Sequence, residues 1–219
     1  MRTSRFLGFL TLLAGLGLAA VNAGAAPAAP APRIVVLGDS LSAGYGIRPE
    51  EGWVALLARR LESEGYGYQV VNASVSGETT AGGLARLPRA LSTHGPAIVI
   101  VELGANDGLR GLPIAQMQKN LAAIVSGIEA AHARVVVVGM QIPSNYGATY
   151  TREFAASFPA VATSFHAALV PFLLAEVALD EANFQADRLH PVAKVQDKLL
   201  DTVWPVLQPL LAKPRAAAH

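Results

Sequence analysis

The chain has 219 residues, of which 52% are hydrophobic, and its formal net charge at pH 7 is +1. A chain of this length normally forms one domain, and its apolar content is ample for a buried core. The nearly balanced charge gives no electrostatic signal for nucleic-acid binding. Because the chain contains no cysteine, disulfides, a thiol nucleophile and cysteine metal sites are all excluded.

The first 32 residues differ in composition from the rest of the chain. Arg2 and Arg5 precede an apolar stretch at 6–21, and small residues at 21, 23 and 25 suit a signal-peptidase site. The stretch is shorter than the ~20 residues that a membrane-spanning helix needs. We therefore expect a cleaved signal peptide at 1–25, cut after Ala23 or Ala25, and a periplasmic or secreted protein. Residues 26–32 then form a Pro/Ala linker.

From residue 33 onward, apolar runs typical of strands alternate with amphipathic helical patterns. The sequence predicts strands at 33–37, 69–72, 97–103, 134–139 and 169–172. It predicts helices at 50–64, 79–93, 113–131 and 151–167, and a last helix from about Pro191 that Pro205 kinks or ends. This alternation predicts a five-stranded parallel sheet in a three-layer α/β/α sandwich, with the flavodoxin-like strand order 2-1-3-4-5. The domain spans residues 33–212, followed by a tail at 213–219.

Polar residues follow the first three predicted strands. Gly38-Asp39-Ser40-Leu41 comes after the first strand and would place Ser40 at the carboxyl edge of the sheet, where α/β proteins build their sites. Gly-Asp-Ser is also common turn chemistry. Gly77 follows the second strand and could be an ordinary turn glycine. Asn106 follows the third and could be an Asx-turn residue, a role that Asp107 could fill equally well.

Near the end of the chain, Asp187 precedes His190 by three residues. This spacing lets the carboxylate reach the imidazole Nδ1, so that His190 could accept the proton of the Ser40 hydroxyl. Asp187 could instead cap a helix that begins at Pro191, with His190 exposed beside it. The pair alone does not decide between these interpretations.

Taken together, the motifs resemble the GDSL or SGNH hydrolases, whose Ser, Gly, Asn and His match Ser40, Gly77, Asn106 and His190. The resemblance covers roughly residues 33–212. Further stretches are similar to the bacterial multifunctional thioesterase I/lysophospholipase/arylesterase branch of the family: 52–57, 71–79, 102–111 and 145–147. Arg188 departs from the pattern, since the family often has a glycine directly after this aspartate.

The resemblance implies a cofactor-independent serine ester hydrolase that forms an acyl-enzyme on Ser40, with Asp187 and His190 completing a triad. It implies that the oxyanion hole consists of the backbone N–H groups of Ser40 and Gly77 and the side-chain amide of Asn106. The expected substrates are small-molecule acyl esters, acyl thioesters and lysophospholipids. We expect no metal, no nucleic-acid partner, no stable membrane span after signal cleavage, and a monomer.

The acyl pocket is expected between the loop at 108–113 and the segment at 141–146. Its candidate apolar residues are Leu109, Leu112, Ile142 and Tyr146. Two other functions remain open at this point. One is a carbohydrate O-acetyl esterase of the same superfamily. The other is a non-enzymatic, flavodoxin-like binding module in which Ser40 caps a helix and binds an anion.

Overall fold

The computed structural model describes residues 30–212. Five parallel strands form one sheet in the order β2-β1-β3-β4-β5, as the sequence predicts. The strands are β1 (Arg33–Gly38), β2 (Gln69–Asn72), β3 (Ile98–Glu102), β4 (Arg134–Val138) and β5 (Ala168–Val170). The expected signal peptide, most of the expected linker and the tail at 213–219 lie outside the described residues.

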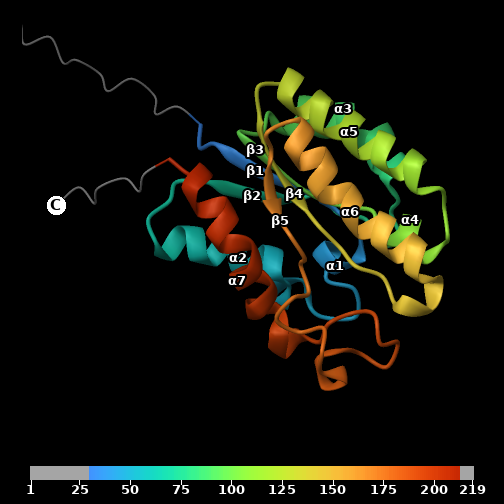
Figure 1. Ribbon diagram of the computed structural model, residues 1–219. Coiled ribbons are helices and arrows are strands. Elements are labelled where there is room, and N and C mark those ends of the chain that lie inside the picture. Colours follow the sequence, from blue (N-terminus) through green and yellow to red (C-terminus); the bar gives the residue numbers. More distant parts are fainter. Residues whose placement is uncertain (1–29, 213–219) are drawn as a thin grey trace, which may run out of the picture. The chain divides into compact units, whose positions relative to one another are not determined.

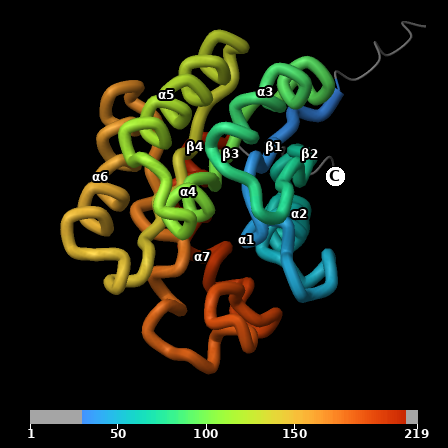
Figure 2. The backbone as a smooth tube through the Cα atoms, turned by 90° about the vertical axis from the view of Figure 1, so that its right-hand side faces the viewer, coloured from blue at the N-terminus to red at the C-terminus, as the bar shows by residue number. Residues whose placement is uncertain are grey.

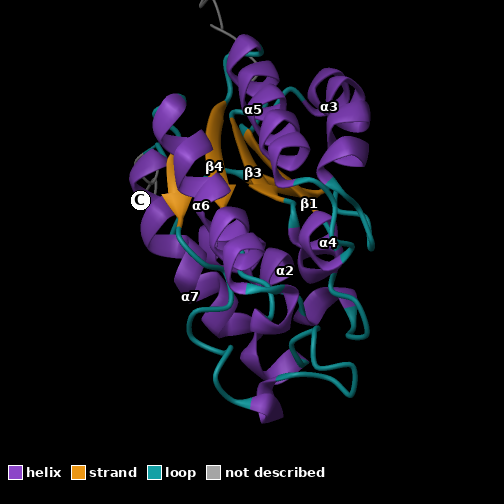
Figure 3. Cartoon of the chain, turned by 45° about the vertical axis from the view of Figure 1, so that its right-hand side comes forward, coloured by secondary structure: helices purple, strands orange, loops and turns teal. Residues whose placement is uncertain are grey.

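Helices cover both faces of the sheet and complete the three-layer sandwich (Figures 1 and 3). On one face, α2 (Trp53–Ser63) packs against α7 (Gln196–Leu207). On the other, α5 (Ile114–Ala130) lies between α3 (Thr80–His94) and α6 (Ala148–Ser164). Within residues 30–212, no helix is both long and apolar enough to cross a membrane.

The central strands are buried on both faces, which explains their nearly continuous runs of valine and isoleucine. β3 is buried along its whole length, and β1 and β4 are buried except at their first residues. The edge strand β2 is only partly buried, and β5 is buried only at its last residue. The burial pattern of each strand thus follows its place in the sheet.

The helices bury the apolar residues that recur at helical spacing. In α5 these include Met117, Leu121, Ile124 and Ile128. The start of α2 is bound to α7, because Gln196 Oε1 accepts a hydrogen bond of 3.1 Å from the backbone N–H of Trp53. This contact satisfies one of the free donors at the start of a helix.

The predicted start of the last helix is wrong. The helix begins at Gln196 rather than around Pro191, which instead forms an antiparallel bridge with Phe184. That bridge holds the segment around residues 183–192 as a loop. Pro205 lies inside the helix. Because proline has no N–H group, the carbonyl of Asp201, four residues earlier, has no helical donor. Asp201 is exposed, so water can reach this carbonyl.

Two short helices that the sequence did not predict follow strands β1 and β3 at the carboxyl edge of the sheet. They are α1 (Ser40–Ala43) and α4 (Ala105–Leu109). Figure 2 shows both at the same edge, with the orange segment that follows β5 below them. This edge therefore brings together the polar motifs of four separate stretches of the chain.

Candidate active site

A tight turn positions Ser40 as the first residue of α1. Asp39 caps this helix, because its Oδ1 accepts a hydrogen bond of 3.0 Å from the Leu41 N–H. Gly38 leaves room for the turn: a Cβ there would lie 2.7 Å from Ser42 Cβ and 2.9 Å from Glu102 Oε2. Gly38 and Asp39 therefore have structural roles in this turn: Gly38 avoids a steric clash, and Asp39 caps the helix.

The side chains of Ser40, His190 and Asp187 form one continuous hydrogen-bonded chain. His190 Nε2 lies 2.8 Å from Ser40 Oγ, and His190 Nδ1 lies 2.7 Å from Asp187 Oδ2. Burial alone would raise the pKa of Asp187, but hydrogen bonds from the backbone N–H groups of Leu189 and His190 and from the imidazole outweigh it and lower this pKa to about 2. An ionised Asp187 can only accept, so Nδ1 carries the proton and Nε2 is free to accept one from Ser40.

Two residues that no motif identified hold the imidazole in place. The ring of Tyr45 lies against that of His190, with 4.5 Å between their centroids. Gln185 Nε2 donates to the carbonyls of Tyr45 (2.8 Å) and Pro191 (3.2 Å), and the Gln185 N–H donates to the carbonyl of His190 (2.8 Å). The contact between Gln185 and Tyr45 joins segments 140 residues apart, which no local sequence pattern reveals.

Arg188 occupies a backbone position that normally favours glycine. Its φ of 59° lies in the left-handed region. This geometry gives a physical reason for the glycine that the family often has here. The loop nevertheless keeps the Asp187–His190 contact, and the Arg188 N–H bonds to the carbonyl of Gln185 at 2.9 Å.

Gly77 also has a left-handed backbone, with a φ of 79°. It lies in an exposed loop between β2 and α3, and Arg110 Nη2 donates to its carbonyl at 2.7 Å. Within residues 30–212, the N–H groups of Gly77 and Ser40 donate to no protein acceptor. Both donors are therefore available to a bound molecule.

Asn106 and Asp107, adjacent on α4, have different environments. Asn106 Nδ2 donates to Asp39 Oδ2 at 3.0 Å, which uses one of its two N–H bonds and leaves the other free. Asp107 is buried and accepts from the Thr80 N–H (2.8 Å) and hydroxyl (2.6 Å). Asp107 therefore anchors the start of α3, and Asn106 is the one whose side chain reaches the site.

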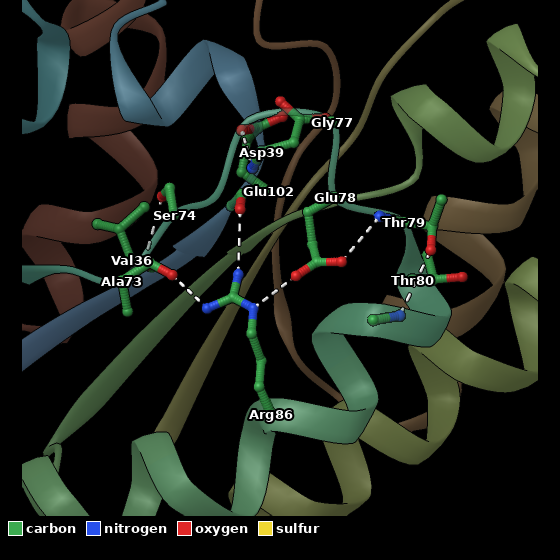
Figure 4. A network of polar contacts seen from close by, with 12 residues as sticks. Val36, Asp39, Ala73, Ser74, Gly77, Glu78, Thr79, Thr80, Arg86 and Glu102 are labelled. Carbon is green, nitrogen blue, oxygen red and sulfur yellow. Dashed lines mark hydrogen bonds and ion pairs between the residues drawn. The ribbon is translucent and has the colours of Figure 1, made fainter.

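Arg86 links the strand ends that carry these residues (Figure 4). From α3 its guanidinium donates to Glu78 Oε2 at 2.8 Å, to the carbonyl of Gly38 at 3.2 Å and to the carbonyl of Ala73. Gly38 lies two residues before Ser40, and Glu78 directly follows Gly77. One half-buried side chain thus connects the Gly77 loop to the Ser40 turn.

A cavity of about 650 Å³ opens beside Ser40, and Gly77, Asn106 and His190 also line it. Leu109 and Ile142 line it. Leu112 and Tyr146 do not, which corrects the prediction: both are exposed, and the Tyr146 hydroxyl donates to the carbonyl of Leu109 at 2.8 Å. Sequence patterns missed a further wall that follows β5 and consists mainly of Phe172, Leu174, Ala175, Ala178 and Leu179.

No group of three or more potential metal-ligating side chains is present in the part of the chain that the structure describes.

Comparison with known proteins identifies the class of protein. Residues 36–198 match the GDSL-like Lipase/Acylhydrolase family. The chain is 50% identical over 183 residues to the esterase TesA of Pseudomonas aeruginosa, covering 84% of this chain and 91% of the relative. It is 42% identical to thioesterase 1/protease 1/lysophospholipase L1 of Escherichia coli K12 (84% and 87% covered) and 41% identical to an arylesterase of Vibrio mimicus (78% and 86% covered).

Solved structures agree with this assignment. A crystal structure of TesA superposes with a TM-score of 0.80 at 50% identity, covering 82% of this chain and 99% of that one. The esterase EstA of Pseudoalteromonas sp., inhibited by monoethylphosphonate, gives a TM-score of 0.78 at 41% identity (81% and 97% covered). The chain belongs to the GDSL-like lipase/acylhydrolase family, and it is a carboxylic ester hydrolase.

Proposed function

We propose that this hydrolase cleaves acyl esters and acyl thioesters through an acyl-enzyme on Ser40. The observation that carries the proposal is the chain from Ser40 Oγ to His190 (2.8 Å) and from His190 to Asp187 (2.7 Å), at the mouth of a largely apolar cavity. Nucleophile, base and orienting carboxylate thus lie within hydrogen-bond distance of one another.

In the first half-reaction, His190 Nε2 takes the proton of Ser40 as Oγ attacks the acyl carbonyl carbon. The ionised Asp187 stabilises the imidazolium that forms. Negative charge develops on the carbonyl oxygen, and the free N–H groups of Ser40, Gly77 and Asn106 are its candidate donors. Collapse of the intermediate breaks the bond to the leaving group, which receives the proton from His190.

In the second half-reaction, water attacks the acyl-enzyme in the same way. His190 now removes a proton from the water as it attacks the acyl carbon, and then gives this proton to Ser40 Oγ as the bond to the acyl group breaks and the acid leaves. Asp107 is not part of this proposal, because both of its carboxylate oxygens are engaged by Thr80.

We further propose substrates with extended acyl chains, including aryl esters, acyl thioesters and lysophospholipids. The cavity walls formed by Leu109, Ile142 and the segment after β5 are apolar and suit an acyl chain rather than a sugar. The names of the relatives, which include a thioesterase 1/lysophospholipase L1 and an arylesterase, support the same breadth.

The catalytic assignment is tested with Ser40→Ala. This variant should lose ester hydrolysis by orders of magnitude while its melting temperature stays close to that of the wild type, because triad residues act as a unit. The wild type should release a burst of nitrophenol and be labelled at Ser40 by an organophosphonate. Retention of more than about a tenth of the activity, a deficit below ~1.4 kcal/mol, would remove Ser40 from the mechanism.

The substrate assignment is tested with p-nitrophenyl esters of increasing acyl length, beside acyl-CoA and acetylated xylan. Each methylene buried in the cavity contributes up to about 0.8 kcal/mol, so kcat/KM should rise up to about fourfold per methylene until the cavity is full. A sharp optimum at acetate, with activity on the acetylated sugar, would instead favour the carbohydrate O-acetyl esterase.

We also propose export of the protein as a monomer, with residues 1–25 removed as a signal peptide. The support is the charged start and apolar stretch of the sequence. Mature protein isolated from the cell envelope should begin near Gly24 or Ala26 by N-terminal sequencing. An intact Met1 on the envelope protein would indicate an anchored form.

A further inference from the structure

Glu102 is a fully buried acid directly beneath the candidate active site, and the mechanism above does not use it. It is the last residue of β3 and pairs in register with Gly38 of β1. Its Oε2 accepts a hydrogen bond of 2.7 Å from the Ser42 hydroxyl and one of 3.3 Å from the Asp39 N–H. Glu102 therefore contacts residues on both sides of Ser40.

Asp39 extends this contact to the second side of the site. It is 1% exposed, and its two carboxylate oxygens accept from the Leu41 N–H and from Asn106 Nδ2, each at 3.0 Å. A continuous set of hydrogen bonds thus runs from Glu102 through Asp39 to the Asn106 amide. Figure 4 shows Glu102 and Asp39 together, close to the Gly77 loop.

We propose that Glu102 is a positioning residue for the oxyanion hole: it fixes Asp39 and Ser42, and through them the donors on Asn106 and Ser40. This inference rests on the proposed function, because it needs those donors to bind the oxyanion. Glu102 does not touch the substrate. It sets the direction of the donors before the substrate arrives, which is the condition for strong electrostatic stabilisation of the transition state.

The protonation state follows from two carboxyl groups that share one buried site. Burial raises the pKa of Asp39 to about 6, and burial together with the charge of Asp39 raises the pKa of Glu102 well above its usual range. Of the two acids, Glu102 is therefore the one that favours the protonated form, which leaves Asp39 as the carboxylate that accepts from Asn106. Glu102 Oε1 is buried and has no hydrogen-bond partner in the described chain, so a negative charge on this carboxyl group would be poorly solvated.

Three other charged or titratable groups face this pair. The Arg86 guanidinium approaches from α3 and donates to the carbonyl of Gly38. The imidazole of His190 lowers the pKa of Asp39 when it carries a positive charge. Asp107 on α4 has both oxygens engaged by Thr80. A neutral Glu102 adds no second negative charge to this group.

The test compares Glu102→Gln with Glu102→Leu. Glutamine is neutral like the protonated acid, with one oxygen to accept from Ser42 and Asp39 and an NH₂ group in place of the O–H, so kcat should stay within about threefold of the wild type. Leucine has a similar size and no polar atom, so kcat should fall about 10- to 100-fold with little change in KM. Glu129→Leu, at an exposed position of α5, is the matched control and should leave both constants unchanged.

A second readout tests the proton itself. A buried acid with a raised pKa contributes stability that is fully present at low pH and is lost as pH rises through the folded-state pKa. Glu102→Gln lacks this loss. Its melting temperature relative to the wild type should therefore increase as pH rises above the ordinary pKa of a glutamate, and a constant difference would overturn the protonated assignment.

Each kinetic outcome decides the inference. Unchanged kcat in Glu102→Leu, or a loss confined to KM, would overturn it. If Glu102→Leu does not fold, Ser42→Ala removes one of the two contacts and should still lower kcat with KM held, and wild-type kcat in that variant would overturn the proposal. Failure of the proposed function is recognised separately, by activity that persists in Ser40→Ala.

Discussion

Replacing Arg86 should lower both the free energy of unfolding and kcat, because its side chain connects Glu78, Gly38 and Ala73. Arg86→Ala removes the bonds to Glu78 (2.8 Å), to the carbonyl of Gly38 (3.2 Å) and to the carbonyl of Ala73. It also leaves Glu78, whose side chain is only 15% exposed, without its cation.

The magnitude follows from the number of bonds and their exposure. A hydrogen bond to a charged group contributes about 1.5–3 kcal/mol, so three independent bonds would give roughly 4.5–9 kcal/mol. These bonds share one side chain that is 25% exposed, so water replaces part of what is lost. We therefore expect a loss of about 2–4 kcal/mol in the free energy of unfolding. For a domain of this size that corresponds to about 4–16 °C in melting temperature.

The assay combines urea unfolding with ester kinetics. Because the Gly77 loop is no longer tied to the Ser40 turn, kcat should fall about tenfold while KM changes less. Arg60→Ala is the matched control. Arg60 is 27% exposed, pairs with Asp201 at 2.7 Å and lies over the ring of Trp204, far from the site in the fold.

The control should cost only about 1 kcal/mol and leave kcat unchanged. The reasoning would be refuted if Arg86→Ala lost no more stability than Arg60→Ala and kept wild-type kcat.

Three further predictions concern the site itself. Asn106→Ala should lower kcat by roughly 10²–10³ with a smaller change in KM. Asn145→Ala, at an exposed position, is the control and should leave kcat unchanged. A rise in KM alone would make Asn106 a binding residue. Asp187→Asn should reduce kcat by about 10⁴, because it favours the wrong tautomer of His190. The lowered pKa of Asp187 contributes stability that is lost as pH falls towards about 2, so the acid unfolding of this variant should depend less on pH. Arg188→Gly should keep wild-type kcat and change the unfolding free energy by no more than about 1 kcal/mol, since relief of the left-handed backbone offsets the entropy of glycine; a large loss of activity would show that the arginine side chain has a role of its own.

The sheet was predictable because its information is local. The runs at 33–37 and 97–103 are rich in valine and isoleucine and bounded by proline and glycine, and they contain the buried strands β1 and β3. The Asp187–His190 contact was predictable for the same reason, since three residues of loop bring the two side chains together. The capping alternative failed because the helix begins only at Gln196.

Other parts of the site depend on contacts that no local pattern encodes. The roles of Asn106 and Asp107 could not be separated from sequence, because the difference lies in their partners, Asp39 on one side and Thr80 on the other. The cavity wall after β5 was missed because its small and apolar residues show no regular period. Leu112 was misplaced because loop residues were assigned to the cavity from their composition alone.

The arrangement also explains how a site assembled from separate loops can be stable without disulfides. The donors on Ser40, Gly77 and Asn106 follow three different strands, so the sheet fixes where each loop begins but not where each N–H group points. The remaining freedom is removed by buried polar residues next to the motifs: Asp39 and Glu102 for Asn106, Arg86 for the Gly77 loop, and Asp107 for the start of α3. An unpaired polar group in such a position is costly, so each link is specific as well as stabilising. Mutations at these neighbouring residues should therefore weaken transition-state stabilisation, although less than mutations of the proposed oxyanion donors.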